Sequence, residues 1–186
     1  MLQVIDEMIL AESIQLERRG RIVADRGEYF RIVEGKTAAL FRWAMLAGAR
    51  CAELDASGLA ALERYGVHLG VAFQAVDDEL DFADTTGKDP LADLREGKIT
   101  YPLVVALERD PALHDRLVGL LADPEPRRDE LAAIAAAVRA TGALTATRAL
   151  AEEHVERALA VLEELPAGAP RDALVTVALA SLERTS

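Results

Sequence analysis

Aromatic residues and cysteine are scarce in this sequence of 186 residues. Aromatics account for 4% of the chain, although hydrophobic residues make up 51% of it, with alanine and leucine dominating. This mixture favours helices, and no alternating apolar run bounded by hairpin turns predicts a strand. The single cysteine, Cys51, excludes a disulfide framework and is typical of a reducing compartment. We expect it to be a small buried hydrophobe.

An excess of positive charge and a long hydrophobic run are also lacking. The formal net charge is −11, which argues against nucleic acid as a partner because phosphate contacts require a basic surface. No run of eighteen apolar residues and no signal peptide can be recognised, so we expect a cytoplasmic protein without membrane insertion. An acidic protein can still bind an anionic substrate where metal ions intervene.

Lysine is the rarer of the two strongly basic residues. Only three of the 21 are lysines, namely Lys36, Lys88 and Lys98, and the others are arginines. A compact, flexible ammonium group suits phosphate binding, so these positions are candidates for contacts with a phosphate. Codon bias together with chance is the alternative explanation.

Apolar residues recur at helical spacing along most of the chain, which predicts a single all-α domain over residues 1–186. A cap at Asp55 or Ser57 begins the helix that leads to the acidic cluster, and the spacing of Gly66 and Gly70 permits close helix packing. The expected helices cover residues 2–19, 28–50, 58–82, a stretch beginning at 100, 112–121, 129–141, 143–164 and 171–184.

Three aspartates close the expected helix over residues 58–82. Asp81 lies four residues after Asp77 and three after Asp78, with Gln74 one turn earlier, so these residues share one side of the helix. Carboxylates at this spacing repel each other, and a divalent cation would offset the repulsion. Oxygen ligands in an incomplete set suit Mg²⁺, whose coordination is often completed by substrate phosphates.

The acidic cluster has two interpretations besides a metal site. A solvated acidic helix end is possible, but the apolar neighbours predict that some of the carboxylates lie close to buried surface, where an unpaired charge is costly. A calcium-binding loop is excluded because Phe82 occupies the position that requires glycine and no glutamate stands at the twelfth position.

The segment F-Q-A-V-D-D-E-L-D over residues 73–81, followed by G-K and then D-L-R-E-G-K-I-T-Y-P-L, resembles the second aspartate-rich region of the trans-type polyprenyl diphosphate synthases. The segments A-E-S-I-Q-L at 11–16 and Y-F-R-I-V-E-G-K-T-A-A-L-F at 29–41 are similar to two further segments of that family, and the tail is similar to its closing helices. The resemblance covers nearly the whole chain and implies an isoprenoid-synthase-like helical bundle.

The resemblance implies roles for specific residues. Asp77, Asp78 and Asp81 would hold Mg²⁺ against an allylic diphosphate, with Asp77 as the most direct ligand. The lysines that contact or approach this diphosphate would be Lys36, Lys88 and Lys98.

The same resemblance implies a reaction. Thr37 and Gln74 would lie close to the ionising carbon and stabilise the cation with their oxygen atoms, and Phe73 would help to line the pocket. The allylic C–O bond would ionise, the double bond of isopentenyl diphosphate would attack, and a proton would pass to the departing pyrophosphate.

The sequence begins at a point that resembles the middle of the family's domain. We therefore expect an N-terminally truncated bundle that lacks the first aspartate-rich motif. We also expect a homo-oligomer, or a partner chain that supplies the N-terminal half, because a truncated bundle exposes apolar surface. A non-catalytic helical subunit or remnant that acts by association is the alternative function. A terpene cyclase is disfavoured because the G-K and D-L-R-E-G-K segments are typical of a synthase.

Overall fold

A computed structural model describes residues 1–83, 91–123 and 125–184, and every regular element within these ranges is a helix. The all-α prediction is therefore confirmed. The elements are α1 (Leu2–Arg18), α2 (Arg26–Val33), the π-helix η1 (Glu34–Ala38), α3 (Ala39–Cys51), α4 (Ala56–Leu80), α5 (Ala92–Arg95), α6 (Tyr101–Arg109), α7 (Leu113–Ala122), α8 (Arg128–Ala140), α9 (Ala143–Leu162) and α10 (Ala169–Leu182).

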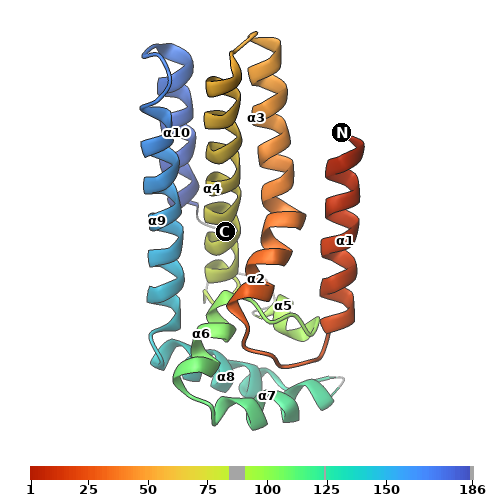
Figure 1. The fold of residues 1–186 in the computed structure, drawn as a ribbon. Coiled ribbons are helices and arrows are strands. Elements are labelled where there is room, and N and C mark those ends of the chain that lie inside the picture. The colour runs from red at the N-terminus through yellow and green to blue at the C-terminus, as the bar shows by residue number, and fades with distance from the viewer. Residues whose placement is uncertain (84–90, 124, 185–186) are drawn as a thin grey trace.

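The long helix α4 lies at the centre of the bundle. It packs against α3 on one side and α9 on another, while α1 stands at the edge beside η1 (Figure 1). The shorter helices α6, α7 and α8 gather at the lower end of the bundle in this view. Buried side chains of α4 contribute to two apolar clusters, one around Val71 and Val76 and one around Tyr65 and Leu69. The acidic end of α4 thus lies where the long helices meet the short ones.

Two glycines of α4 allow α3 and η1 to approach its backbone. A Cβ atom placed on Gly70 would lie 2.5 Å from the Cα atom of Ala38, and one placed on Gly66 would lie 2.7 Å from the Cα atom of Arg42. The close packing predicted for this pair is confirmed. Gly35 of η1 serves the same purpose against α1, because its Cβ atom would lie 2.8 Å from the Cβ atom of Ala11.

The helix expected over residues 28–50 is present, but its middle turn differs. Residues Glu34–Ala38 form a π-helix between α2 and α3, and this wider turn carries Lys36 and Thr37. Single π turns inside helices are frequent at functional sites. The prediction of a buried Cys51 is wrong: the side chain is exposed, at the last residue of α3.

Two histidines pair between α4 and α9. The Nδ1 atoms of His68 and His154 lie 3.3 Å apart, and Phe30 stacks on the His154 ring. Burial, reinforced by His68 and Arg157, lowers the pKa of His154 to about 4. The two rings therefore pack against each other at the contact between α4 and α9.

The buried histidine predicts acid sensitivity of the fold. Because His154 binds a proton more readily in the unfolded chain, its contribution to stability is present above pH 6.5 and is lost as the pH falls toward 4. We expect His154 to lower the free energy of unfolding by about 1 to 2 kcal/mol between pH 7 and pH 5, against the opposite contribution of the buried carboxyls of Asp78 and Asp81. Urea denaturation of the wild type and of His154→Leu checks this, since the difference between the two proteins isolates the contribution of the histidine. An equal pH dependence in both proteins would contradict the assignment.

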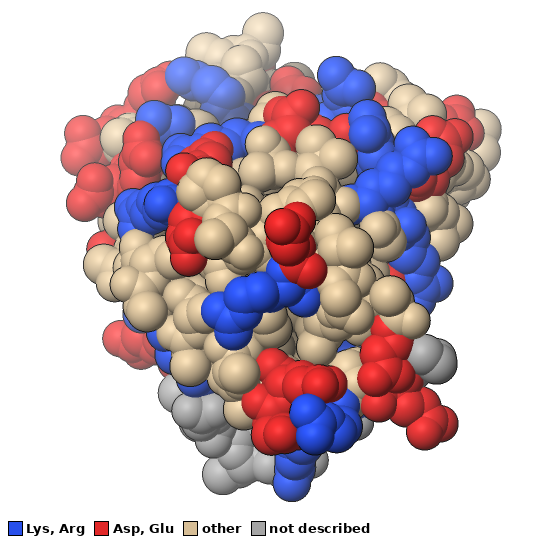
Figure 2. All heavy atoms as spheres, turned by 90° about the horizontal axis from the view of Figure 1, so that it is seen from below, with Lys and Arg blue, Asp and Glu red and all other residues tan. Residues whose placement is uncertain are grey.

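Surface charges are mixed on the face at the lower end of the bundle. Lys and Arg side chains are interspersed with Asp and Glu side chains there (Figure 2). Within the described part of the chain, no helix combines the length and the apolar character needed to cross a membrane.

Candidate functional site

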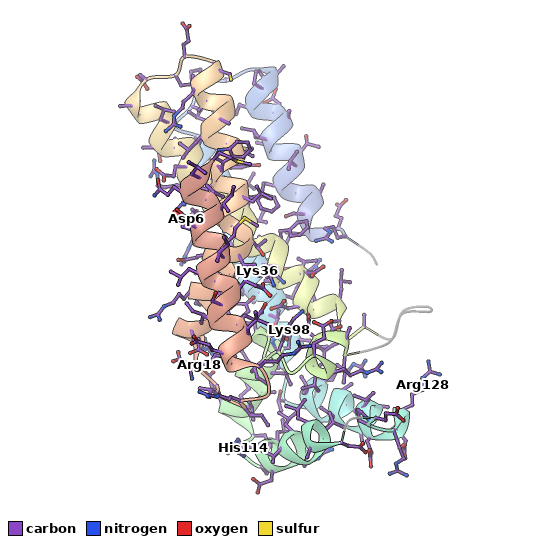
Figure 3. The ribbon with its side chains drawn as sticks, turned by 90° about the vertical axis from the view of Figure 1, so that its right-hand side faces the viewer. Asp6, Arg18, Lys36, Lys98, His114 and Arg128 are labelled. Carbon is purple, nitrogen blue, oxygen red and sulfur yellow. The ribbon has the colours of Figure 1, made fainter. Side chains whose placement is uncertain are left out.

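A cavity of about 240 Å³ lies between α1, η1, the end of α4 and the segment that follows α5. Most of the predicted site residues with described positions line it. Lys36 and Thr37 come from η1, Gln74, Asp77 and Asp78 from α4, and Lys98 from the segment before α6. Lys36 and Lys98 lie on the same side of the molecule, near the C-terminal end of α1 that carries Arg18 (Figure 3). Lys88 lies outside the described residues.

A chain of hydrogen bonds links η1, α4 and α6 at the cavity. The Thr37 hydroxyl donates to Gln74 Oε1 at 2.8 Å, and Gln74 Nε2 donates to Asp78 Oδ1 at 2.8 Å. The backbone N–H of Tyr101, at the first turn of α6, donates to Asp78 Oδ2 at 3.2 Å. Thr37 and Gln74 therefore face each other, and the carboxylate of Asp78 holds the Gln74 side chain in place.

The three aspartates of the cluster differ in environment. Asp78 is only 1% exposed, and burial raises its pKa to about 7 despite the hydrogen bonds from Gln74 and Tyr101. The carboxylate of Asp81 accepts the N–H groups of Ala92 and Asp93 and so caps α5; burial, with Asp93 nearby, raises its pKa to about 6.

Asp77 is the open carboxylate of the cluster. Its side chain is 51% exposed, and Arg184 approaches it with an N–O separation of 3.6 Å. Within the described residues, no three histidine, cysteine, aspartate or glutamate side chains are grouped closely enough to hold a metal ion. The donor set here therefore fits an ion such as Mg²⁺ that takes one or two carboxylates and completes its shell with water or phosphate oxygens.

The ammonium group of Lys36 is held by two acceptors from a neighbouring helix. Lys36 Nζ lies 2.6 Å from Glu12 Oε2 and 2.7 Å from Gln15 Oε1, both on α1. These two residues belong to the segment at 11–16 that resembles the family, and their three-residue spacing was the signal that they share a helix face. Sequence reasoning assigned them no role.

Lys98 is paired on its own segment. Its Nζ lies 2.8 Å from Asp93 Oδ1 and 2.8 Å from Glu96 Oε2. Burial disfavours the charged form, but the two carboxylates outweigh it and raise the pKa of Lys98 above its usual range. The ammonium group is therefore charged at every physiological pH. Lys98 thus lines the cavity as a fixed cation.

Two buried hydroxyls in the cavity wall lack a hydrogen bond of normal geometry. Among the described residues they are the Tyr29 hydroxyl, which lies near the Asp78 carboxylate, and Thr100 Oγ1. Burial, with the Asp78 carboxylate nearby, raises the pKa of Tyr29 well above its usual range. Leaving a buried polar group unsatisfied costs about 1 to 3 kcal/mol. These two hydroxyls make this part of the cavity wall polar.

Phe73 lies beside the cavity and does not line it. Its ring packs against Phe41, with centroids 5.2 Å apart, and the guanidinium carbon of Arg184 lies 3.9 Å from the ring centroid. Arg184, just beyond α10, thus reaches the same end of α4 as Asp77. This contact could not be expected from the sequence, because nothing in the local pattern of α10 indicates that its end returns to this place.

Known proteins of one family are similar in sequence to this chain. The family model described as polyprenyl synthetase matches residues 1–138. Octaprenyl diphosphate synthase of Escherichia coli (strain K12) is 35% identical over 164 residues, covering 84% of this chain and 49% of the relative. Heptaprenyl diphosphate synthase component 2 of Bacillus subtilis (strain 168) is 31% identical over 179 residues, covering 95% of this chain and 51% of the relative.

Solved structures share the fold. A decaprenyl diphosphate synthase from Rhodobacter capsulatus superposes with a TM-score of 0.91 at 30% identity, covering 98% of this chain and 57% of that one. A polyprenyl synthase from Caulobacter crescentus CB15, complexed with calcium and isoprenyl diphosphate, gives a TM-score of 0.91 at 33% identity, covering 100% of this chain and 58% of that one. The chain spans about half the length of the curated relatives it matches. On the family match and these relatives, the chain belongs to the polyprenyl synthetase family.

Proposed function

We propose that this chain supplies the second aspartate-rich half of a prenyltransferase site, which condenses an allylic prenyl diphosphate with isopentenyl diphosphate in isoprenoid biosynthesis. One observation carries the proposal: a single cavity is lined by two lysines, a threonine–glutamine pair and an open aspartate, contributed by η1, α4 and the segment before α6. Cations suit a diphosphate, and neutral oxygens suit an electron-poor carbon beside it. The family membership supports the same substrates.

Mg²⁺ is the proposed metal, and Asp77 is the proposed direct ligand. The ion would neutralise the diphosphate and make it a better leaving group. Asp81 lies one turn further along α4 and would contribute to the same metal site, although its oxygens also cap α5. Asp78 completes the predicted set from a buried position. The complex of the Caulobacter crescentus relative with calcium and isoprenyl diphosphate supports a divalent ion and a diphosphate for this chain.

The cavity residues would contact two different parts of the substrate. Lys36 and Lys98 would bind the diphosphate oxygens, in exchange for part of their present contacts with Glu12 and Asp93. Thr37 and Gln74 would face the allylic carbon as its bond to oxygen weakens. Lys88 is the third proposed lysine of this group.

An elongation assay tests the proposal. The chain is combined with an N-terminal half of a family member and is given farnesyl diphosphate, radiolabelled isopentenyl diphosphate and Mg²⁺. We expect longer prenyl diphosphates to form only when both halves are present. No elongation by a folded, associated pair would overturn the proposal.

A non-catalytic subunit that acts by association is the second candidate, favoured by one observation. The Bacillus subtilis relative is named component 2 of a heptaprenyl diphosphate synthase, which indicates that this relative works with another component. Under this alternative, Asp77→Ala and Lys36→Ala would leave the effect of the chain on its partner intact. Under the prenyltransferase proposal, both substitutions abolish product formation.

The outer side of α1 is the proposed surface for association. Its buried residues Val4 and Ala11 face the bundle, whereas an apolar stripe on the other side is exposed. The spacing of three, four and seven residues places the stripe on one side of the helix. We define the α1 stripe as Leu2, Ile5, Ile9 and Leu16. We propose that it packs against a helical partner, either a second copy or the chain with the other half of the site.

Introducing a charge into the α1 stripe should weaken association. We expect Ile9→Glu to raise the dissociation constant at least tenfold, because an unpaired carboxylate would be buried in an apolar interface. Stability of the isolated chain should change by less than about 0.5 kcal/mol, since Ile9 is 59% exposed. Sedimentation velocity measures the association, with Val118→Glu on α7 as the matched control. Equal behaviour of the two variants would contradict the assigned surface.

A further inference from the structure

The hydrogen-bond chain at the cavity has a defined polarity. Gln74 carries both a donor and an acceptor at the end of its side chain, so its amide can in principle face Thr37 in either of two orientations. An ionised carboxylate only accepts, so Asp78 requires the amide nitrogen of Gln74 on its side. The carbonyl oxygen of Gln74 is then left to face Thr37, whose hydroxyl donates to it.

The two carboxylate oxygens of Asp78 both accept hydrogen bonds from fixed donors. Its other oxygen accepts the backbone N–H of Tyr101, which is fixed as a donor by the first turn of α6. The nearby Tyr29 hydroxyl can donate or accept, so it imposes no polarity of its own. The side chain of Asp78 is buried, so water does not compete for either oxygen. The orientation of Gln74 therefore depends on a donor in α6 that does not line the cavity.

We propose that Asp78 is a positioning residue, which fixes the Gln74 amide so that an oxygen, and not an N–H group, is presented to the cavity. The consequence of this orientation rests on the proposed function: the Gln74 oxygen would favour an electron-poor carbon beside the diphosphate. It assigns to Asp78 a task distinct from that of the exposed Asp77, although the two are neighbours in sequence.

Asp78→Asn should reverse the order of donors and acceptors along the hydrogen bonds that link Asp78, Gln74 and Thr37, without changing the shape of the side chain at position 78. The side-chain oxygen of the introduced asparagine remains with the Tyr101 N–H, because that backbone group can only donate. The new NH₂ group then faces Gln74, which must turn its own oxygen toward it. The Gln74 NH₂ group would consequently point to Thr37 and the cavity, where it would repel a developing positive charge.

A second substitution should restore the original polarity. A glutamate in place of Gln74 accepts from both sides, so in the double variant Asp78→Asn/Gln74→Glu it can take the NH₂ group of the introduced asparagine and the hydroxyl of Thr37. Gln74→Glu alone would set two carboxylates against each other. The two substitutions should therefore each be harmful singly and compensate when combined.

The test is a double-mutant cycle on the full chain, measured by urea denaturation at pH 8.5, above the pKa of about 7 of Asp78. We expect Gln74→Glu to lower the folding equilibrium constant at least tenfold and the double variant to recover most of that loss. In parallel, ¹⁵N NMR of the Gln74 side-chain amide should show a large shift in Asp78→Asn. Asp81→Asn is the matched control: it removes a carboxylate one turn away and should leave the Gln74 amide signals in place.

The functional readout compares two probes. In Asp78→Asn, the dissociation constant of an ammonium analogue of an allylic diphosphate should rise about tenfold relative to that of farnesyl thiolodiphosphate. In the double variant, the relative affinity of the two probes should return to that of the wild type. Additive losses in the cycle, together with an unchanged Gln74 signal in Asp78→Asn, would overturn the positioning role. If the cycle and the NMR agree with it but neither probe binds to the wild type, the proposed function fails and the positioning role stands.

Discussion

Gly70→Ala should lower the free energy of unfolding by about 3 kcal/mol, the upper part of the range for overpacking a tight interface. The new methyl group would lie 2.5 Å from the Cα atom of Ala38 and 2.8 Å from its Cβ atom. No flexible side chain can move aside there, so η1 must separate from α4. This loss exceeds the gain of about 1 kcal/mol that alanine brings over glycine inside a helix.

The separation should also disturb the cavity. Thr37 directly precedes Ala38, and its hydrogen bond to Gln74 joins the two elements one turn beyond Gly70. Urea denaturation measures the stability, with Gly48→Ala on α3 as the control, because nothing lies within 4 Å of a Cβ atom at that position. The control should be neutral or stabilised by up to about 1 kcal/mol. Equal effects at the two glycines would contradict the close approach of α4 to η1.

Asp77→Ala should reduce prenyl transfer by about a thousandfold, or roughly 4 kcal/mol of transition-state stabilisation. Under the proposed function, Asp77 is the open carboxylate that contacts the metal, and removing it leaves the leaving group poorly neutralised. Folding should change little, because the side chain is half exposed and its ion pair with Arg184, at 3.6 Å, is weak.

The matched control for this substitution lies on the same helix. Glu63→Ala removes one exposed carboxylate from α4 at a distance from the cavity lining, and transfer should stay within about twofold of the wild type. The elongation assay with both halves present measures both variants. A thousandfold loss in both, or in neither, would exclude a specific role for Asp77.

Much of the fold could be predicted from the sequence. Apolar periodicity gave the helices of the long segments to within a few residues, and the spacing of Gly66 and Gly70 indicated a close helix contact. The scarcity of lysine drew attention to Lys36 and Lys98, which line one cavity in the structure. These signals are local or compositional, so they can be read without knowing how the helices pack.

The remaining features depend on packing. A π turn has no period of its own over five residues, so Glu34–Ala38 could not be distinguished from an ordinary helix. The four-residue helix α5 is too short for a periodic pattern. Asp77 and Asp78 are equivalent in the sequence, but a rotation of about 100° per residue turns one toward solvent and the other toward α6. That difference requires the position of α6.

Leu91 has a backbone conformation that could not be predicted from its residue type. Its backbone is left-handed, with φ of 59°, a region that favours glycine. A non-glycine residue pays about 1 kcal/mol for this conformation. Its side chain is fully buried in the cluster beneath α5, and this burial offsets the backbone cost.

The central claim is that the cavity binds an allylic diphosphate together with a divalent metal. Isothermal titration calorimetry of the chain with farnesyl thiolodiphosphate, in Mg²⁺ and in EDTA, tests it most directly. We predict binding in Mg²⁺ that weakens at least tenfold in EDTA and in both Asp77→Ala and Lys36→Ala, while Glu63→Ala binds as the wild type does. Binding that is independent of Mg²⁺ and unchanged by the substitutions at Asp77 and Lys36 would contradict the claim.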